Sequence, residues 1–203
     1  MTKKDGGMSD QSDPEIRQIV QRVLNQALGL STASTDATPP AEPAPQAEPQ
    51  IPERKIVAIG ADHGGFDLKE ILRADLPGMG FDVIDTGTNS KEAVDYPDFA
   101  HQVAHLVSMG KAWRGIVIDG AGIGSCIVAN KLPGVRAGMA YDYSTAVNGR
   151  EHNDTNVLTL GAGLIGVGLA KQIVKTWLST GYGGGRHARR VDKISAIEKL
   201  YLK

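Results

Sequence analysis

The sequence has little cysteine, no long apolar run and no excess of either charge, and each absence excludes a class of protein. A single cysteine, Cys126, rules out an internal disulfide and fits a reducing compartment. No apolar run approaches the roughly 18 residues that a membrane span requires. The 22 basic and 23 acidic side chains give a net charge of −1. This balance argues against a nucleic-acid-binding protein that works through bulk positive charge.

Proline and charge are unevenly distributed, and they divide the chain in two. Six of the ten prolines lie between Pro39 and Pro52. Residues 1–53 carry four basic and eight acidic side chains, a net of −4, whereas residues 54–203 carry 18 and 15, a net of +3. We therefore predict one folded domain after an extended N-terminal arm. The predicted segments are a disordered stretch (1–11), an amphipathic helix (12–30), a Pro/Ala-rich linker (31–53) and the domain (54–203).

The predicted helix over residues 12–30 has one apolar face and no domain beside it. Apolar side chains recur at i, i+3, i+4 and i+7 from Ile16 to Leu28, after a capping-box pair at Ser12 and Glu15. A helix of about four turns is marginal alone, so it either packs back on its own domain or docks in a groove of another protein. The arrangement resembles encapsulation peptides of bacterial microcompartments. This resemblance implies shell proteins as partners and a cytoplasmic location inside such a compartment.

From residue 54 onward, short buried runs alternate with longer amphipathic segments. The runs predict strands over 55–59, 81–85, 115–119, 135–140 and 157–160. Helices are predicted between them, including 66–76 and 98–109, and a long one follows over 165–178. Such alternation predicts an α/β protein, a Rossmann-like three-layer α/β/α sandwich with a five-stranded parallel sheet.

Candidate functional residues follow the predicted strands, because open α/β sheets bind ligands beyond the carboxyl ends of their strands. Gly60–Gly65 follows the first strand and Asp119–Ser125 the third. The fourth leads into Tyr141–Tyr143 and onward to Arg150–Asp154. The glycines after the third strand allow backbone N–H groups to face an anion or oxyanion. The turn lacks the dinucleotide and P-loop spacings, and a simple tight turn is the structural alternative.

Five segments, in order over about 150 residues, resemble the family of ribose-5-phosphate isomerase B and the galactose-6-phosphate isomerase subunits. They are Ile59–Phe66, Val94–Asp98, Gly122–Gly124 with Ala129–Lys131, Arg150–Asp154 and Gly184–Arg190. The resemblance implies an aldose–ketose isomerase of phosphosugars, with ribose 5-phosphate and ribulose 5-phosphate as the preferred pair and an enediolate between them. It implies no metal and no nucleotide cofactor. It also implies a homodimer or dimer of dimers whose active site is shared between chains.

The resemblance assigns individual roles as well. It implies that His152 assists ring opening and that Asn153 lies beside the enediolate. It places Asp62 and His63 near the sugar and its phosphate, and Tyr96 in the wall of the sugar pocket. The implied backbone anion hole consists of Gly120, Gly122 and Gly124, and the implied phosphate clamp, reaching into the partner's site, consists of Arg186 and Arg190. Arginine suits this last task because it contacts phosphate in a bidentate manner.

The sequence departs from the family at the position of the catalytic base. Many relatives have a cysteine where this chain has Asp119, and others have a glutamate at the position of Ser125. We prefer Asp119 as the base, since a carboxylate near an apolar strand end can accept a carbon-bound proton. The alternative is a subunit without activity of its own that depends on a cysteine-bearing partner subunit. Cys126 follows Ser125 and is expected to be structural.

Two further departures leave the identity of the phosphosugar open. Ala121 stands where a hydroxyl residue is common, and Gly163 stands where an arginine often helps to hold phosphate. His101 and His105 are four residues apart on a predicted helix, but no third ligand accompanies them. We therefore expect both histidines on the surface and no metal site.

Overall fold

The structure is a computed structural model that describes residues 55–202. The predictions for residues 1–11, 12–30 and 31–53 lie outside the described residues. The described elements, in chain order, are β1 (Ile56–Ala61), α2 (Phe66–Asp75), the short 3-10 helix η1 (Leu76–Met79), β2 (Asp82–Asp85), α3 (Tyr96–Ser108), β3 (Arg114–Asp119), α4 (Ile123–Ala129), β4 (Ala137–Met139), α5 (Tyr143–Asn153), β5 (Val157–Gly161), α6 (Val167–Ser179), the 3-10 turn η2 (Gly185–His187) and α7 (Ala188–Tyr201).

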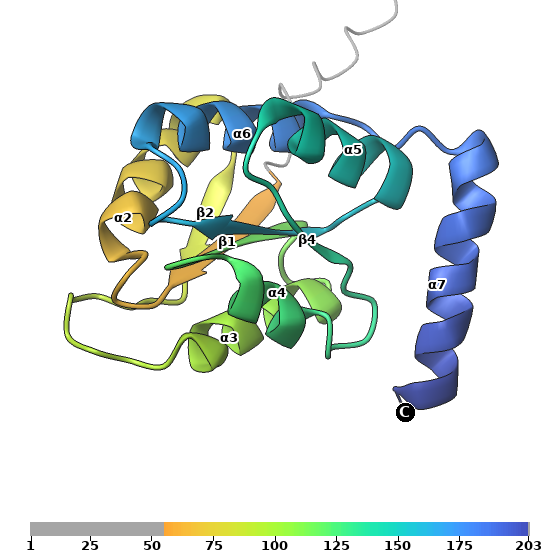
Figure 1. Cartoon of the computed structure of the whole chain (residues 1–203), viewed down its shortest axis with the longest axis horizontal. Coiled ribbons are helices and arrows are strands. Elements are labelled where there is room, and N and C mark those ends of the chain that lie inside the picture. The colour runs from red at the N-terminus through yellow and green to blue at the C-terminus, as the bar shows by residue number, and fades with distance from the viewer. Residues whose placement is uncertain (1–54, 203) are drawn as a thin grey trace, which may run out of the picture. The chain divides into compact units, whose positions relative to one another are not determined.

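The five strands form one parallel sheet in the order β2-β1-β3-β5-β4. Alternate side chains of β1 pack on opposite faces. Val57 and Ile59 join the core beneath α2, α5 and α6, whereas Ala58 joins the core beneath α3 and α4. Figure 1 shows these two helical layers above and below the sheet. The predicted α/β/α sandwich is therefore confirmed.

Burial on both faces explains why the central strands read as continuous apolar runs. All six residues of β3 are buried, and so are all five of β5. Parallel strands covered by helices on both sides require such runs. Gly115 in β3 permits a close helix approach, because a Cβ there would lie 2.5 Å from a methyl of Val103 in α3.

The direction of the strands gives the sheet two chemically different edges. We call the ends of β1, β3 and β5 the carboxyl edge and their beginnings the amino edge. The helices α5 and α6 run back against the strands, so their last turns lie at the amino edge. Contacts fix this placement: Arg114, the first residue of β3, donates hydrogen bonds to the carbonyls of Trp177 and Leu178 near the end of α6, at 2.6 and 3.1 Å.

The last helix, α7, stands beside the sandwich (Figure 1). Val191 is its one buried residue. Its apolar side chains Ile194, Ile197 and Leu200 are 46, 58 and 67% exposed. A cavity of about 810 Å³ separates part of α7 from β4 and α5. Over residues 55–202, no helix has the length and apolar character of a membrane span.

Candidate active site

The turn after β3 is organised by the carboxylate of Asp119. One oxygen, Oδ1, accepts hydrogen bonds from the backbone amides of Ala121, at 2.8 Å, and Gly122. The other, Oδ2, accepts from the amide of Ser125, at 3.1 Å, and from its hydroxyl. Asp119 is only 5% exposed and Ser125 is fully buried. The carboxylate thus closes the glycine turn onto the start of α4.

This arrangement changes the expectation for the glycines. The amide of Gly122 already donates to Asp119, so it is not available to an external anion in this conformation. Gly122 has a φ of +79° and a Cβ there would lie 2.9 Å from the backbone of Leu160, so glycine is required by the turn itself. Gly124 lies in the first turn of α4, where the helix offers its amide no carbonyl.

The loop after β1 lies against this turn. The amide of Gly65 donates to Asp62 Oδ1 at 3.0 Å, and Asp62 is 8% exposed. A Cβ on Gly64 would lie 3.7 Å from the amide nitrogen of Gly120. The exposed ring of His63 places Nδ1 3.2 Å from the amide of Val94. The structure therefore brings the predicted residues of the first and third strand ends together.

Tyr96, the first residue of α3, completes this group. A Cβ on Gly124 would lie 2.5 Å from the ring of Tyr96, which is itself 38% exposed. The aromatic ring thus needs a residue without a side chain beneath it. We call the following residues the carboxyl-edge group: Asp62, His63, Tyr96, Asp119, Gly120, Gly122 and Gly124.

Cys126 lies one turn into α4, and its thiol faces β4. Its thiol donates toward the carbonyl of Ala137 in β4, at 3.5 Å. Burial raises the pKa of the Cys126 thiol above its ordinary value. A protonated, inward-facing thiol fits the expected structural role.

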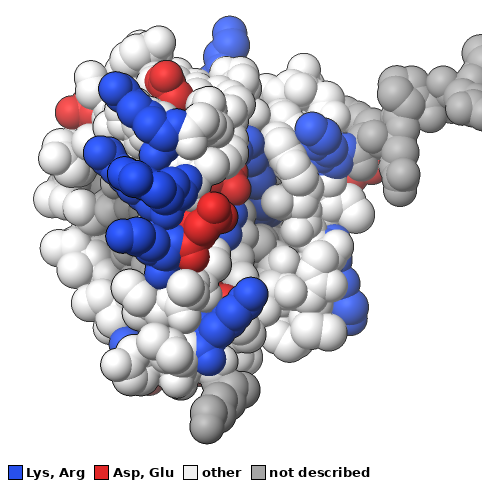
Figure 2. All heavy atoms as spheres, turned by 90° about the vertical axis from the view of Figure 1, so that its right-hand side faces the viewer, with Lys and Arg blue, Asp and Glu red and all other residues white. Residues whose placement is uncertain are grey.

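The remaining predicted residues gather at the other edge of the sheet. The ring of His152 stacks on that of His187, with centroids 4.1 Å apart and an interplanar angle of 7°. Burial and the nearby His152, Arg186 and Arg190 lower the pKa of His187. Figure 2 shows Lys and Arg side chains gathered on the face that carries α7. We call the following residues the amino-edge group: His152, Asn153, Arg186, His187 and Arg190.

Two amides of α5 set the orientation of this group. Nδ2 of Asn148 lies 2.8 Å from Nδ1 of His152. An amide nitrogen can only donate, so a neutral His152 carries its proton on Nε2. The Asn153 side chain folds back on the same helix, because its Nδ2 donates to the carbonyl and the side-chain oxygen of Asn148 at 3.2 and 3.1 Å.

In a single chain, the segment Arg150–Asp154 lies away from the carboxyl edge. In sequence it follows the fourth strand, at the far end of α5. The helix runs back across the sheet, however, and its last turn lies beside the beginnings of β4 and β5, where Arg136 Nε donates to the carbonyl of Asp154 at 2.9 Å. Among residues 55–202, no hydrogen bond or ion pair joins the carboxyl-edge group to the amino-edge group.

Sequence reasoning gave no role to His187, although it lies within a segment that carries the resemblance. Its stacking on His152 depends on the fold and has no local signal. No cluster of three or more His, Cys, Asp or Glu side chains suited to a metal occurs in the part of the chain that the structure describes. His101 and His105 stack on each other on α3, with ring centroids 5.8 Å apart, and both are exposed.

Comparisons with known proteins agree with this architecture. A family model described as Ribose/Galactose Isomerase matches residues 57–194. The chain is 48% identical over 145 residues to ribose-5-phosphate isomerase B of Escherichia coli, covering 71% of this chain and 97% of that protein. It is 42% identical over 143 residues to D-erythrulose-4-phosphate isomerase of Pectobacterium atrosepticum, covering 70% and 94%. The solved ribose-5-phosphate isomerase B of Clostridium thermocellum has a TM-score of 0.71 and 50% identity, covering 72% of this chain and 99% of that one.

Proposed function

The chain belongs to the ribose/galactose isomerase family and is an isomerase, and from that premise we propose that it interconverts the aldose and ketose forms of a phosphosugar. Ribose 5-phosphate and ribulose 5-phosphate are the first candidates, since two of the similar proteins carry that activity in their names. The observation that carries the proposal is the carboxyl-edge group, in which the buried carboxylate of Asp119 closes a glycine turn and the ring of Tyr96 packs on Gly124.

The reaction requires five functions, and the chain offers residues for each. His152 Nε2–H donates to the ring oxygen as the sugar ring opens. Asp119 accepts the proton from carbon 2, and the resulting enediolate is stabilised by Asn153 and by backbone amides of Gly120 and Gly124. Arg186 and Arg190 hold the phosphate. Asp62, His63 and Tyr96 position the sugar.

For Asp119 to act as the base, one of its four hydrogen bonds must open. The Ser125 hydroxyl is the donor that can leave, because it rotates about a single bond whereas the three amides are fixed in the turn. Rotation exposes a lone pair on Oδ2 for the carbon-bound proton. The same proton then returns to carbon 1 while the hydroxyl proton on the carbon-2 oxygen moves to the carbon-1 oxygen, and the carboxylate regains its hydrogen bond.

The separation of the two groups supports a site shared between two chains. A single chain holds the proposed base at the carboxyl edge and the proposed clamp at the amino edge, so a second copy must supply the missing half. The exposed apolar residues of α7 offer surface for such pairing. We propose a homodimer, or a dimer of dimers, on this ground.

Subunit mixing tests the shared site. Asp119→Asn and His152→Ala homodimers should each be inactive, but a mixed dimer keeps one complete site. Random exchange of subunits makes about half of the dimers mixed, and each mixed dimer has one intact site out of two. About a quarter of all sites are then intact, so about a quarter of wild-type activity should return. The control pair is His152→Ala with Arg186→Ala, both from the amino edge, which should regain nothing. If the mixture of Asp119→Asn and His152→Ala shows no activity although subunit exchange has been verified, the shared site is refuted.

A substrate panel tests the reaction itself. Purified protein would be incubated with four-, five- and six-carbon aldose phosphates, and ketose formation would be followed. Ribose 5-phosphate should give the highest kcat/KM. Turnover of another phosphosugar in preference would revise the substrate, and turnover of none would refute the activity. No cofactor is added in any arm, as the proposal requires none.

One observation favours a second candidate, a subunit that is inactive by itself. All four acceptor positions of Asp119 are occupied within its own turn, and Gly163 offers no side chain to the phosphate. A partner subunit carrying a cysteine would then supply the base. The discriminating result is activity that appears only after mixing with such a homologue.

We also propose that residues 12–30 direct the enzyme into a bacterial microcompartment in the cytoplasm. The support is the amphipathic pattern and the Pro/Ala-rich linker in the sequence. A fusion of residues 1–53 to a fluorescent protein should co-localise with shell proteins, and Leu24→Glu should abolish this. Diffuse fluorescence of the unmodified fusion in cells that assemble shells would overturn the targeting proposal.

A further inference from the structure

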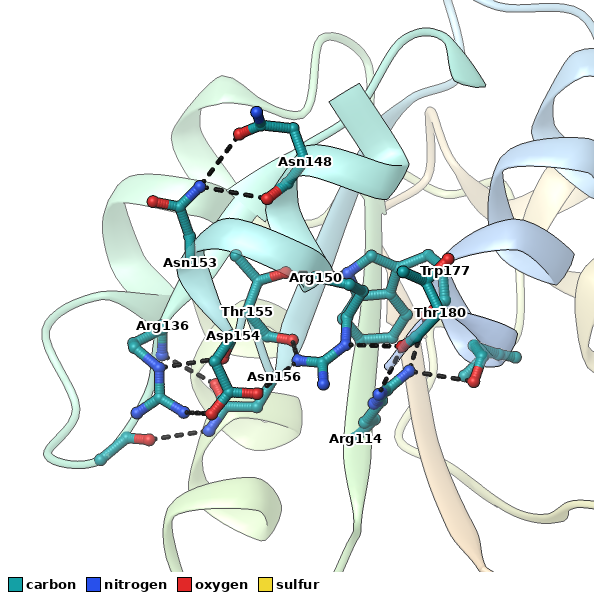
Figure 3. Close-up of polar contacts among 12 residues, drawn as sticks. Arg114, Arg136, Asn148, Arg150, Asn153, Asp154, Thr155, Asn156, Trp177 and Thr180 are labelled. Carbon is teal, nitrogen blue, oxygen red and sulfur yellow. Dashed lines mark hydrogen bonds and ion pairs between the residues drawn. The ribbon is translucent and has the colours of Figure 1, made fainter. Parts of the chain in front are cut away.

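Two buried arginines converge on one backbone carbonyl at the amino edge. Arg114 and Arg150 are 5 and 6% exposed. Arg114 Nη2 and Arg150 Nε donate to the carbonyl oxygen of Thr180, at 3.3 and 3.4 Å (Figure 3). Thr180 follows the last residue of α6 and immediately precedes the glycine-rich segment 181–185, which leads directly to Arg186 and His187.

Arg150 also binds the end of its own helix. Its Nη1 donates to Oδ1 of Asp154, at 2.9 Å, and to the carbonyl of Thr155. One guanidinium therefore ties the last turn of α5 to the residue that follows α6. A planar group with several fixed donors can make these contacts together, whereas a lysine ammonium cannot reach both directions.

Placing two like charges side by side in the interior is costly. Burial and the neighbouring Arg150 lower the pKa of Arg114 to about 9, and burial lowers the pKa of Arg150. Buried ionic groups are often replaceable by apolar ones without loss of stability. Their presence here therefore fits a directional task that apolar packing does not perform.

That task is the placement of the glycine segment. The amide of Gly183 donates to the carbonyl of Glu151, at 2.9 Å, one residue before His152. His187 then stacks on His152. The segment is thus fixed at three points: the Thr180 carbonyl, the Gly183 amide and the His187 ring.

We propose that Arg150 is a positioning residue for the phosphate-binding half of the site. It sets the path of segment 181–185 and thereby the place of Arg186 and His187 relative to His152. The inference rests on the proposed function for the role of Arg186. Arg150 itself is buried behind the segment and acts through it.

Arg150→Lys tests the proposal, with Arg136→Met as its matched control. Lysine keeps the charge but loses the bridge to Thr180. Arg136 Nη2 pairs with the same Asp154 at 2.7 Å, and none of its hydrogen bonds reaches segment 180–187. Arg150→Lys should raise the KM for ribose 5-phosphate roughly ten- to a hundredfold while kcat changes little, since a misplaced clamp weakens ground state and transition state alike. Arg136→Met should leave KM unchanged.

A second pair of variants avoids the interior. A Cβ on Gly183 would lie 3.0 Å from the carbonyl oxygen of Glu151, whereas a Cβ on Gly181 would meet nothing within 4 Å. Both glycines are exposed. Gly183→Ala should push the segment off α5 and raise KM, and Gly181→Ala should not. This pair decides the question if Arg150→Lys fails to fold.

Binding of inorganic phosphate, measured by calorimetry, separates this inference from the proposed function. Weaker phosphate binding in Arg150→Lys and Gly183→Ala, with both controls unchanged, supports the positioning role even if the wild type turns over no sugar. Wild-type KM and phosphate affinity in both test variants would overturn it, with the proposed activity intact. An equal rise of KM in Arg136→Met would overturn it too, because the effect would then be general loosening of the fold.

Discussion

In the Asp119→Asn variant, one buried carboxylate oxygen becomes an NH2 group that faces hydrogen-bond donors. Asn can keep an oxygen toward the amides of Ala121 and Gly122 and turn its nitrogen toward Ser125. The Ser125 hydroxyl can rotate to accept from that nitrogen. The Ser125 amide cannot, and it is left buried without a partner.

The cost follows from these contacts. A buried amide without a partner costs about 1–3 kcal/mol, and each bond that loses the charge of its acceptor weakens by about 1 kcal/mol. We therefore expect Asp119→Asn to lower the free energy of unfolding by about 2–5 kcal/mol. Ser125→Ala, which removes only the hydroxyl and leaves every amide paired, should cost about 1 kcal/mol.

Urea unfolding at one fixed protein concentration measures both values, and turnover is measured on the folded fraction without denaturant. If Asp119 is also the base, kcat falls by roughly a hundred- to ten-thousandfold. A loss of stability with turnover retained would make Asp119 a structural residue alone. A variant as stable as the wild type would refute the reasoning about the turn.

Three further predictions concern single side chains. Cys126→Ala should leave kcat and KM unchanged in the isomerase assay, because the thiol donates to the backbone of β4. The pKa of His187 is lowered in the folded protein, so as the pH falls the unfolded chain takes up this proton before the folded chain does. Stability therefore falls as the pH drops from the ordinary histidine range through the lowered pKa. The midpoint of thermal unfolding should depend less on pH across that range in His187→Asn than in the wild type. Lys69→Met should lower the free energy of unfolding in urea by roughly 2–3 kcal/mol, since the fully buried Lys69 is paired with Asp85 at 2.7 Å, and Asp85 keeps some contact with water.

The strands were predictable because they are buried on both faces. The predicted strand 157–160 matches β5 to within one residue, since every one of its side chains is apolar or packed. The predicted strand 135–140 is longer than β4, which spans Ala137–Met139. Val135 and Ala140 are buried, but they lie outside the ladder. Apolar patterning reports burial and does not report where backbone pairing ends.

The two halves of the candidate site differ in how far the sequence could place them. Asp62 directly follows β1 and Asp119 is the last residue of β3, so a parallel sheet brings them to one edge without further information. His152 lies at the end of a helix, and its edge depends on the direction of that helix. The role of Arg150 had no sequence signal, because its partners at Thr155 and Thr180 are backbone carbonyls.

The division between the edges separates two properties that a one-chain site would couple. The distance from the proposed base to the proposed phosphate clamp is set by how two chains dock, and not by the sheet of either one. Substitutions such as Ala121 and Gly163 act on the carboxyl-edge group and its surroundings, whereas the arginine contacts at Thr180 act on the clamp. If the site is shared as proposed, changes that act on Asp119 should alter kcat, and changes that act on the phosphate clamp should alter KM. A change in the length of the accepted phosphosugar should instead follow from residues between the chains, among them the exposed side chains of α7.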